Sequence, residues 1–277
     1  MKTDVKKLYD YHMHSVGSFD GKNSVNELAE HGLKVGLKGI CVTEHHDSNK
    51  SYPEYGYYNP STQIIAVNEA RDKYGDEIEI YNGLEVDYEP FLESDVKEMI
   101  EKIPNLDVRL GSVHVSCFGL QFNFLDQIDK MILSNADFEK LYNVYYNDLE
   151  ALIKSDLFDV IAHIDYPKRC GVRTINGEVP TIYYDGMDKI MKLAADSGIA
   201  IEINTRNAII GKPLTAPEFA VDKYIEYGGR YITLGSDTHA ASQIGNSLYM
   251  GYNVLEKHGI GQTIFIKREP KILDLIK

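Results

Sequence analysis

Short apolar runs alternate with amphipathic stretches along the chain. Seven of these runs predict buried strands, because each is only a few residues long and is bounded by polar or glycine-containing segments. The predicted strands are Leu8–Tyr11, Gly39–Thr43, Ile78–Val86, Val108–Val113, Asp159–His163, Ile199–Asn204 and Tyr231–Gly235. A later run, Thr263–Ile266, predicts either one further strand or a closing segment.

Helical spacing of apolar residues fills most of the segments between these strands. Ser24-Val25-Asn26-Glu27 has the pattern of a capping box and Gly36 that of a helix end, which together predict a first helix. Further helices are predicted at Pro60–Tyr74, Asp137–Leu157, Tyr183–Ser197 and Ala216–Tyr227.

Strands that alternate with helices are typical of parallel β/α units wound in one direction. The first strand leads into His12-Met13-His14, and no Gly-x-Gly-x-x-Gly motif follows it, which argues against a dinucleotide-binding sheet. We therefore expect an α/β fold with a closed or nearly closed barrel, and a single domain over residues 1–277.

Charge, cysteine content and hydropathy narrow the function classes. The 42 acidic residues exceed the 29 basic ones, and a net charge of −13 disfavours binding to duplex nucleic acid. Cys41, Cys117 and Cys170 have no paired spacing, so we expect reduced thiols. No apolar signal core or run of about 18 apolar residues is present, so we expect a cytoplasmic location and no membrane contact.

Imidazole and carboxylate side chains follow the predicted strands one after another. In chain order they are His12 and His14, His45, Glu85, His114, His163 and finally Asp237 with His239. The C-terminal ends of the strands ring one mouth of a β/α barrel, so these residues are expected to converge there. Residues two apart on an extended chain point the same way, which pairs His163 with Asp165.

This set of ligands exceeds what one tetrahedral ion requires, which predicts two or three divalent metal ions. Manganese, iron and zinc all accept imidazole and carboxylate ligands, and Glu85 is the candidate to bridge two ions. His31 and His258 lie away from strand ends and are expected to have no metal role. His46 adjoins His45 but would point the other way in an extended strand.

These motifs resemble the polymerase and histidinol phosphatase (PHP) domain hydrolases. The matching segments, in the order of that family, are His12-Met13-His14, Thr43-Glu44-His45, Gly83-Leu84-Glu85, Ser112-Val113-His114, Ala162-His163 and Gly235-Ser236-Asp237-Thr238-His239. The resemblance covers nearly the whole chain. It implies a distorted seven-stranded β/α barrel that holds two or three divalent metals and cleaves phosphoesters.

The resemblance also implies ligand roles. It assigns metal binding to His12, His14, His45, Glu85, His114, His163, Asp237 and His239, and it adds Asp20, eight residues after His12. The segments Gly83–Tyr88 and Phe158–Asp165 and the pair Asn204-Thr205 are most similar to the histidinol-phosphate phosphatase branch. The run that follows Asn204-Thr205 departs from that branch and moves the expected phosphate-binding arginine to Arg206.

The expected activity is hydrolysis of L-histidinol phosphate to L-histidinol and phosphate, a step of histidine synthesis. A hydroxide that bridges metal ions would attack phosphorus, since bound cations lower the pKa of water to about 7. Asp20 and Asp165 could assist proton transfer, and the sequence does not decide which group protonates the leaving alkoxide. Another phosphoesterase activity, on nucleotides, oligonucleotides or phosphotyrosine, and a non-catalytic metal-binding module are the alternatives.

The phosphate also requires cationic partners near the metals. Lys168 and Arg169 follow the fifth strand and Arg206 follows the sixth, at the same expected mouth, and arginine suits bidentate phosphate binding. Arg173 and Lys212 are weaker candidates. The loop at 46–59, with four tyrosines plus Asp47 and Glu54, is long enough to form a lid over a small cationic substrate. The sequence does not specify an oligomeric state.

Overall fold

Seven parallel strands form the main sheet of the protein. The computed structural model describes residues 7–52, 54–116, 120–121 and 132–276. The strands lie in the order β1-β2-β3-β4-β8-β10-β11, so neighbours in the sheet follow one another along the chain. Their bounds are β1 Tyr9–Asp10, β2 Gly39–Asp47, β3 Glu79–Asp87, β4 Val108–Ser112, β8 Val160–Ile161, β10 Ala200–Asn204 and β11 Ile232–Gly235.

The first and last strands approach each other and nearly close the sheet into a barrel. The backbone N–H of Tyr11 donates to the carbonyl of Leu234 at 2.8 Å, and that of Asp237 donates to the carbonyl of His12 at 2.8 Å. Met13 and Thr238 form a further parallel bridge beyond the strands. The predicted α/β barrel is therefore confirmed, and its closure runs through the segments that carry His12, His14 and Asp237.

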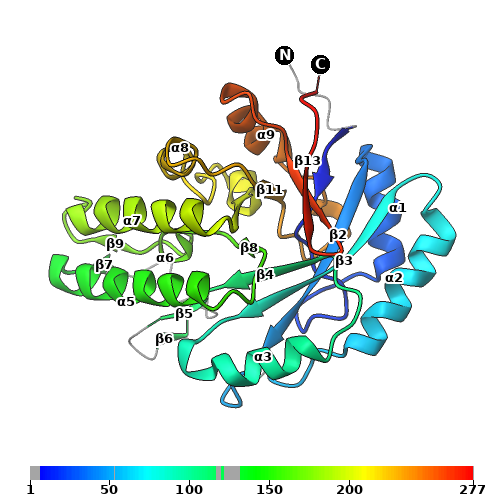
Figure 1. The fold of residues 1–277 in the computed structure, drawn as a ribbon, viewed down its shortest axis with the longest axis horizontal. Coiled ribbons are helices and arrows are strands. Elements are labelled where there is room, and N and C mark those ends of the chain that lie inside the picture. The colour runs from blue at the N-terminus through cyan, green and yellow to red at the C-terminus, as the bar shows by residue number, and fades with distance from the viewer. Residues whose placement is uncertain (1–6, 53, 117–119, 122–131, 277) are drawn as a thin grey trace.

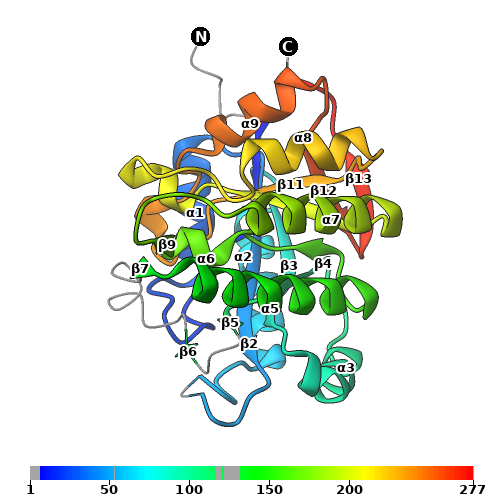
Figure 2. The same cartoon turned by 90° about the vertical axis from the view of Figure 1, so that its left-hand side faces the viewer.

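Helices cover the outside of the strands (Figure 1). α1 and α2 lie on one side, and α5, α7 and α8 lie on the other, as the turned view also shows (Figure 2). The helix bounds are α1 Val25–Val35, α2 Pro60–Tyr74, α3 Glu93–Glu101, α5 Asn135–Lys154, α6 Tyr166–Arg169, α7 Thr181–Ser197, α8 Glu218–Glu226 and α9 Leu248–Lys257. Among the described residues, no helix has the length and apolar content needed to cross a lipid bilayer.

The ends of α1 illustrate how local sequence sets the helix bounds. Ser24 accepts from the backbone of Glu27 and the Glu27 carboxylate accepts from the backbone of Ser24, so the predicted capping box is formed. Gly36 ends the helix with φ of 87°, a left-handed conformation that favours glycine. Apolar residues on one face of the helix, including Val25 and Leu28, are buried against the barrel.

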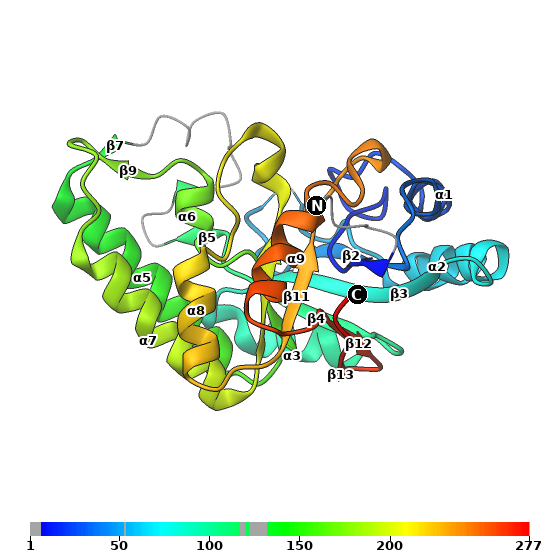
Figure 3. The same cartoon turned by 90° about the horizontal axis from the view of Figure 1, so that it is seen from above.

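The interior of the barrel is apolar at the N-terminal end of the strands and polar at the C-terminal end. A second hydrophobic cluster, separate from the one under the helices, contains Tyr9, Cys41, Tyr81, Ile264 and Phe265. The last two residues belong to an antiparallel hairpin, β12 (Thr263–Ile266) with β13 (Glu269–Ile272), which lies near β4 and β11 in Figure 3. The predicted run at Thr263–Ile266 is thus a closing segment and not a strand of the barrel.

Residues an even number of positions apart on a strand face the same way, so the same strands supply both the apolar and the polar part of the barrel interior. Glu85 lies four residues beyond Tyr81 on β3, and His45 lies four residues beyond Cys41 on β2, so each pair shares one face of its strand. The barrel floor is therefore filled with aromatic and aliphatic side chains, and the mouth with imidazoles and carboxylates. Two short strand pairs, β5 (Val115–Ser116) with β6 (Leu120–Gln121) and β7 (Ile132–Leu133) with β9 (Arg173–Thr174), lie outside the main sheet.

Candidate metal centre

The eight imidazole and carboxylate residues predicted at strand ends lie together at the C-terminal mouth. They form four overlapping groups of three, and in each group one ligand atom per residue lies within 4.8 Å of the others. The groups are His14 with His45 and His239; His12 with His163 and Asp237; His12 with His14 and Glu85; and Glu85 with His114 and His163. Because the groups share members, they form one continuous cluster.

Glu85 occupies the centre of this cluster. Its Oε2 lies 3.0 Å from His45 Nδ1 and 3.1 Å from His12 Nε2, and its Oε1 lies 2.7 Å from His163 Nε2. The side chain is fully buried, and no hydrogen bond ends on Oε2. Burial raises the pKa of Glu85, but the nearby His12 and His45 outweigh it and hold that pKa well below its usual range. A buried, charged carboxylate surrounded by imidazoles is the arrangement expected of a bridging ligand.

Pairs of imidazole nitrogens face each other across short gaps. The Nε2 atoms are 3.1 Å apart in His12 and His14, 3.2 Å in His114 and His163, and 3.4 Å in His45 and His239. Two facing nitrogens can share at most one hydrogen, whereas a cation between them can use both lone pairs. The donor set of nitrogens and carboxylate oxygens therefore fits zinc, manganese or iron ions.

Glu202 orients His12 and was not predicted from the sequence. Its Oε1 lies 2.7 Å from His12 Nδ1, so this ring nitrogen carries the hydrogen and Nε2 is left to bind a metal. Burial lowers the pKa of His12, but Glu202 and Glu85 outweigh it and raise the pKa well above its usual value. The available signal was a single acid within the apolar run of β10. Gly235 permits this contact, because a Cβ there would overlap both Glu202 and His12.

Asp20, to which the family resemblance assigns a ligand role, lies at the edge of the cluster. Its Oδ2 is 2.8 Å from His239 Nε2 and its Oδ1 is 3.8 Å from His45 Nε2. Burial raises the pKa of Asp20, but His239 and His45 outweigh it and lower the pKa to about 2. The buried Glu44, part of the motif Thr43-Glu44-His45 but given no role from the sequence, accepts a hydrogen bond from Ser18 Oγ at 2.5 Å and so holds the loop before Asp20.

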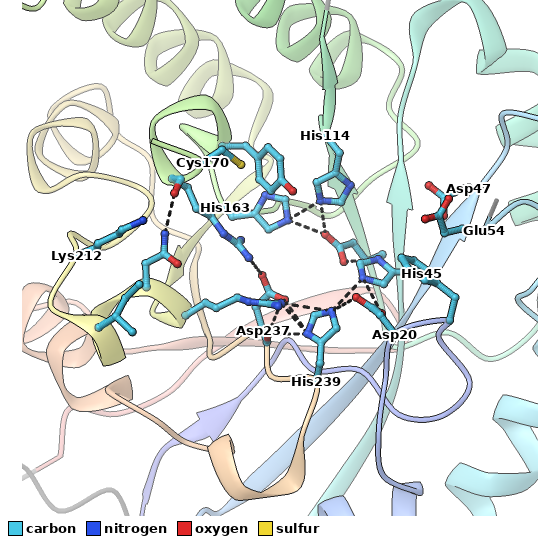
Figure 4. Close-up of a pocket in the computed structure, with 17 residues that line it drawn as sticks. Asp20, His45, Asp47, Glu54, His114, His163, Cys170, Lys212, Asp237 and His239 are labelled. Atoms are coloured by element: carbon cyan, nitrogen blue, oxygen red, sulfur yellow. Dashed lines mark hydrogen bonds and ion pairs between the residues drawn. The ribbon is translucent and has the colours of Figure 1, made fainter. Parts of the chain in front are cut away.

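A cavity of about 430 Å³ opens above the cluster (Figure 4). Arg169 and Arg206 line it, and both contact Asp237: Arg169 at 2.6 Å through Oδ2, Arg206 at 2.8 Å through Oδ1. Burial raises the pKa of Asp237, but the two guanidinium groups outweigh it and hold the pKa well below its usual range. Two of the three predicted phosphate-binding residues thus lie beside the candidate metal ligands, and Lys212 also lines the cavity.

Lys168 lies elsewhere. Its side chain is exposed, with the ammonium group 4.2 Å from the centre of the Tyr183 ring, and it is not among the residues that line the cavity. Lys168 and Arg169 are neighbours on the short helix α6, and successive residues of a helix point in different directions. The structure therefore does not support phosphate binding by Lys168, nor by the exposed Arg173.

Asp165 does not point toward the cluster either. Its two oxygens accept hydrogen bonds from the hydroxyls of Tyr142 at 2.8 Å and Tyr183 at 2.7 Å, and it is not among the residues that line the cavity. The prediction assumed extended backbone from His163 to Asp165, but the strand ends at Ile161 and the two residues have φ of 27° and 79°. This placement does not support proton transfer by Asp165.

Replacing Asp165 with alanine is expected to destabilise the protein without stopping turnover. Two buried tyrosine hydroxyls would lose their acceptor, at a cost of about 1–3 kcal/mol in the free energy of unfolding. We expect kcat to change less than about threefold, because the side chain contacts no ligand of the cluster. Denaturant unfolding and steady-state kinetics check this. A loss of kcat beyond about 100-fold with metal content retained would restore the catalytic role.

The remaining histidines lie outside the cluster. His31 Nδ1 is 3.2 Å from the carbonyl of Glu27, and His258 Nε2 is 2.8 Å from Asp222. His46 faces a separate cavity, with its Nε2 3.0 Å from Ser48 Oγ. Of the predicted lid at 46–59, only Asp47 and Glu54 line the main cavity among the described residues, so its tyrosines are not part of the wall. Cys41 and Cys170 are buried and form no disulfide among the described residues, and Cys117 lies outside those residues.

The comparisons with known proteins agree with this geometry. A family model described as PHP domain matches residues 10–206, which includes seven of the nine predicted ligands. The chain belongs to the PHP domain family. The match ends before Asp237 and His239, yet these two residues complete the same cluster.

Individual PHP domain relatives extend over nearly the whole chain. The Clostridium acetobutylicum protein named "Probable histidinol-phosphatase" is 30% identical over 268 residues, covering 94% of this chain and 98% of its own length. The histidinol-phosphatase of Lactococcus lactis is 27% identical and covers 92% of each chain. The crystal structure of the histidinol phosphate phosphatase of L. lactis, complexed with zinc, L-histidinol and phosphate, superposes with a TM-score of 0.80 at 21% identity, covering 95% and 98% of the two chains.

Proposed function

We propose that this protein is a metal-dependent phosphomonoesterase that hydrolyses L-histidinol phosphate to L-histidinol and phosphate. The observation that carries the proposal is the cluster of eight imidazole and carboxylate ligands beside two arginines in one cavity. The names of the relatives indicate L-histidinol phosphate as the substrate. The zinc, L-histidinol and phosphate bound by the L. lactis enzyme are consistent with this substrate.

We further propose two or three divalent ions, of manganese, iron or zinc, held by the cluster and Asp20. Four overlapping ligand groups support more than one ion, and Glu85 has contacts on both of its oxygens. When bound, such cations supply a nucleophile at neutral pH and neutralise charge that develops on the phosphoryl oxygens.

The residues of the chain then have distinct tasks. Arg169 and Arg206 would bind phosphoryl oxygens, since both guanidinium groups line the cavity and a planar fork matches phosphate geometry. Asp237 holds both arginines in place through its two oxygens. Asp20 is the carboxylate placed to assist proton transfer, because it lines the cavity and its Oδ2 is 2.8 Å from His239.

A panel of phosphomonoesters tests the proposed function. Manganese-loaded protein should hydrolyse L-histidinol phosphate with a kcat/KM at least about tenfold above those for nucleotides and phosphotyrosine. A tenfold preference for a nucleotide would assign the protein to another phosphoesterase activity. Metal-loaded protein that turns over none of these esters would favour the non-catalytic metal-binding module.

Replacing Arg169 with alanine is expected mainly to weaken substrate binding. Loss of a charge-assisted contact to phosphate should raise KM roughly 10- to 100-fold while bound metal is retained. Lys168→Ala is the matched control, because it removes the adjacent cation that lies outside the cavity. Steady-state kinetics and elemental analysis of both variants check this. An unaltered KM in Arg169→Ala, or an equal rise in Lys168→Ala, would contradict the assignment.

A further inference from the structure

The cavity above the cluster carries opposite charges on opposite sides. Lys212 lies on one side of the metal-ligand residues, and Asp47 and Glu54 lie on the other (Figure 4). Arg169 and Arg206 add to the cationic part of the wall. A small phosphomonoester whose organic part carries a positive charge would match both sides, with its phosphate toward the arginines.

Asp47 carries a buried carboxylate that has no bonding partner in the part of the chain that the structure describes. The residue is 8% exposed and lines the cavity, and no described residue forms a hydrogen bond or an ion pair with its carboxylate. A buried charge without a partner is costly, so a carboxylate of this kind at a cavity wall points to a cationic ligand.

Asp87 places a second buried carboxylate beside Asp47. The two residues are partners in the register of β2 and β3, so their carboxylates adjoin on neighbouring strands. Asp87 Oδ1 accepts from the backbone N–H of His114 at 3.0 Å, while its Oδ2 is buried without a hydrogen-bond partner. Like charges next to each other destabilise a sheet, and a nearby cation would relieve this repulsion.

The loop after β2 brings Glu54 to the same side of the cavity. This loop is fastened by Asn49 and Tyr52, whose side chains donate to Glu89 at 2.7 and 3.2 Å. Glu54 itself is half-buried and lines the cavity near Asp47. None of the candidate metal-ligand groups found among the described residues includes Asp47, Asp87 or Glu54.

We propose that Asp47 and Glu54 bind the primary ammonium group of the substrate's organic part, with Asp87 strengthening the negative field behind Asp47. This inference rests on the proposed function and adds the residues that select the substrate. An ammonium group has three N–H donors, enough to reach both carboxylates. Phosphoesters without a cationic organic part would leave Asp47 unpaired, and those with further anionic groups would be repelled.

A pair of substrates and four proteins test the proposal. The substrates are L-histidinol phosphate and its deamino analogue 3-(imidazol-4-yl)propyl phosphate, which differ only in the ammonium group. The proteins are the wild type, Asp47→Asn, Glu54→Gln and the control Glu98→Gln, which alters an exposed glutamate of α3 paired with Lys102. The readout is the ratio of the two kcat/KM values within each protein, so differences in metal loading cancel.

We expect the wild type and Glu98→Gln to prefer L-histidinol phosphate by at least about tenfold, and Asp47→Asn and Glu54→Gln to lose most of that preference. Should both variants keep the wild-type ratio, the proposal is overturned. Equal hydrolysis of the two esters by the wild type would also overturn it while leaving the phosphatase function intact. A wild type that hydrolyses neither ester overturns the proposed function itself. Glu54→Gln keeps the test valid if the buried Asp47 variant folds poorly.

Discussion

Replacing Glu85 with alanine is expected to remove most of the bound metal and to lower kcat at least about 1000-fold. Glu85 contacts five histidines of the cluster, and its loss would leave those imidazoles without their shared carboxylate. Alanine would supply no ligand atom in place of this carboxylate, which is buried at the base of the cavity. Elemental analysis and steady-state kinetics with L-histidinol phosphate measure both effects.

Glu79→Ala is the matched control for this variant. Glu79 lies at the other end of the same strand, where its carboxylate accepts from Tyr9 and Tyr81 and is partly exposed. It should retain metal and turnover within about threefold. Unchanged metal content in Glu85→Ala would remove Glu85 from the cluster, and equal losses in Glu79→Ala would indicate a general effect on folding.

Removal of metal from the wild-type protein is expected to abolish activity and lower thermal stability together. A ligand that binds only the folded state at 100 times its Kd stabilises that state by about 2.7 kcal/mol per site. For a chain of this size, two such sites correspond to a fall in Tm of roughly 10–20 °C on chelation. Turnover should fall at least about 100-fold and return when manganese or zinc is restored.

Metal-saturated chelator is the control for that experiment, because it separates removal of metal from other effects of the chelator. Thermal unfolding and the phosphatase assay are read on the same samples, each with its metal content measured. Full activity in protein stripped of metal would show that the cluster does not take part in the reaction. A loss of activity with an unchanged Tm would show that the metals take part in catalysis but do not stabilise the fold.

The alternation of strands and helices could be predicted because each element buries its own apolar face. The predicted strand at Asp159–His163 is longer than the observed β8, Val160–Ile161, because the chain turns into a left-handed conformation at His163. Helix α3 was not predicted, since it is short and buries only Val96 and Ile100. The spacing of apolar residues in one segment does not predict a backbone turn, such as the one at His163, that depends on contacts with neighbouring strands.

The clustering of the candidate metal ligands could be predicted because strand ends converge whatever the details of the loops. Asp165 and Lys168 were wrongly placed near the cavity, because their directions depend on the turn after β8 and on the first turn of α6. Glu202 and Glu44 were given no role because the position of an acid along a strand gives no indication of its partner. Their contacts with His12 and Ser18 appear only when distant strands are brought together.

Anomalous X-ray scattering from crystals of protein grown with manganese and zinc tests the central claim most directly. We expect two or three peaks among His12, His14, His45, Glu85, His114, His163, Asp237 and His239, each about 2.0–2.3 Å from ring nitrogens or carboxylate oxygens. Peaks confined to other parts of the molecule, or none at all under ample metal, would contradict it.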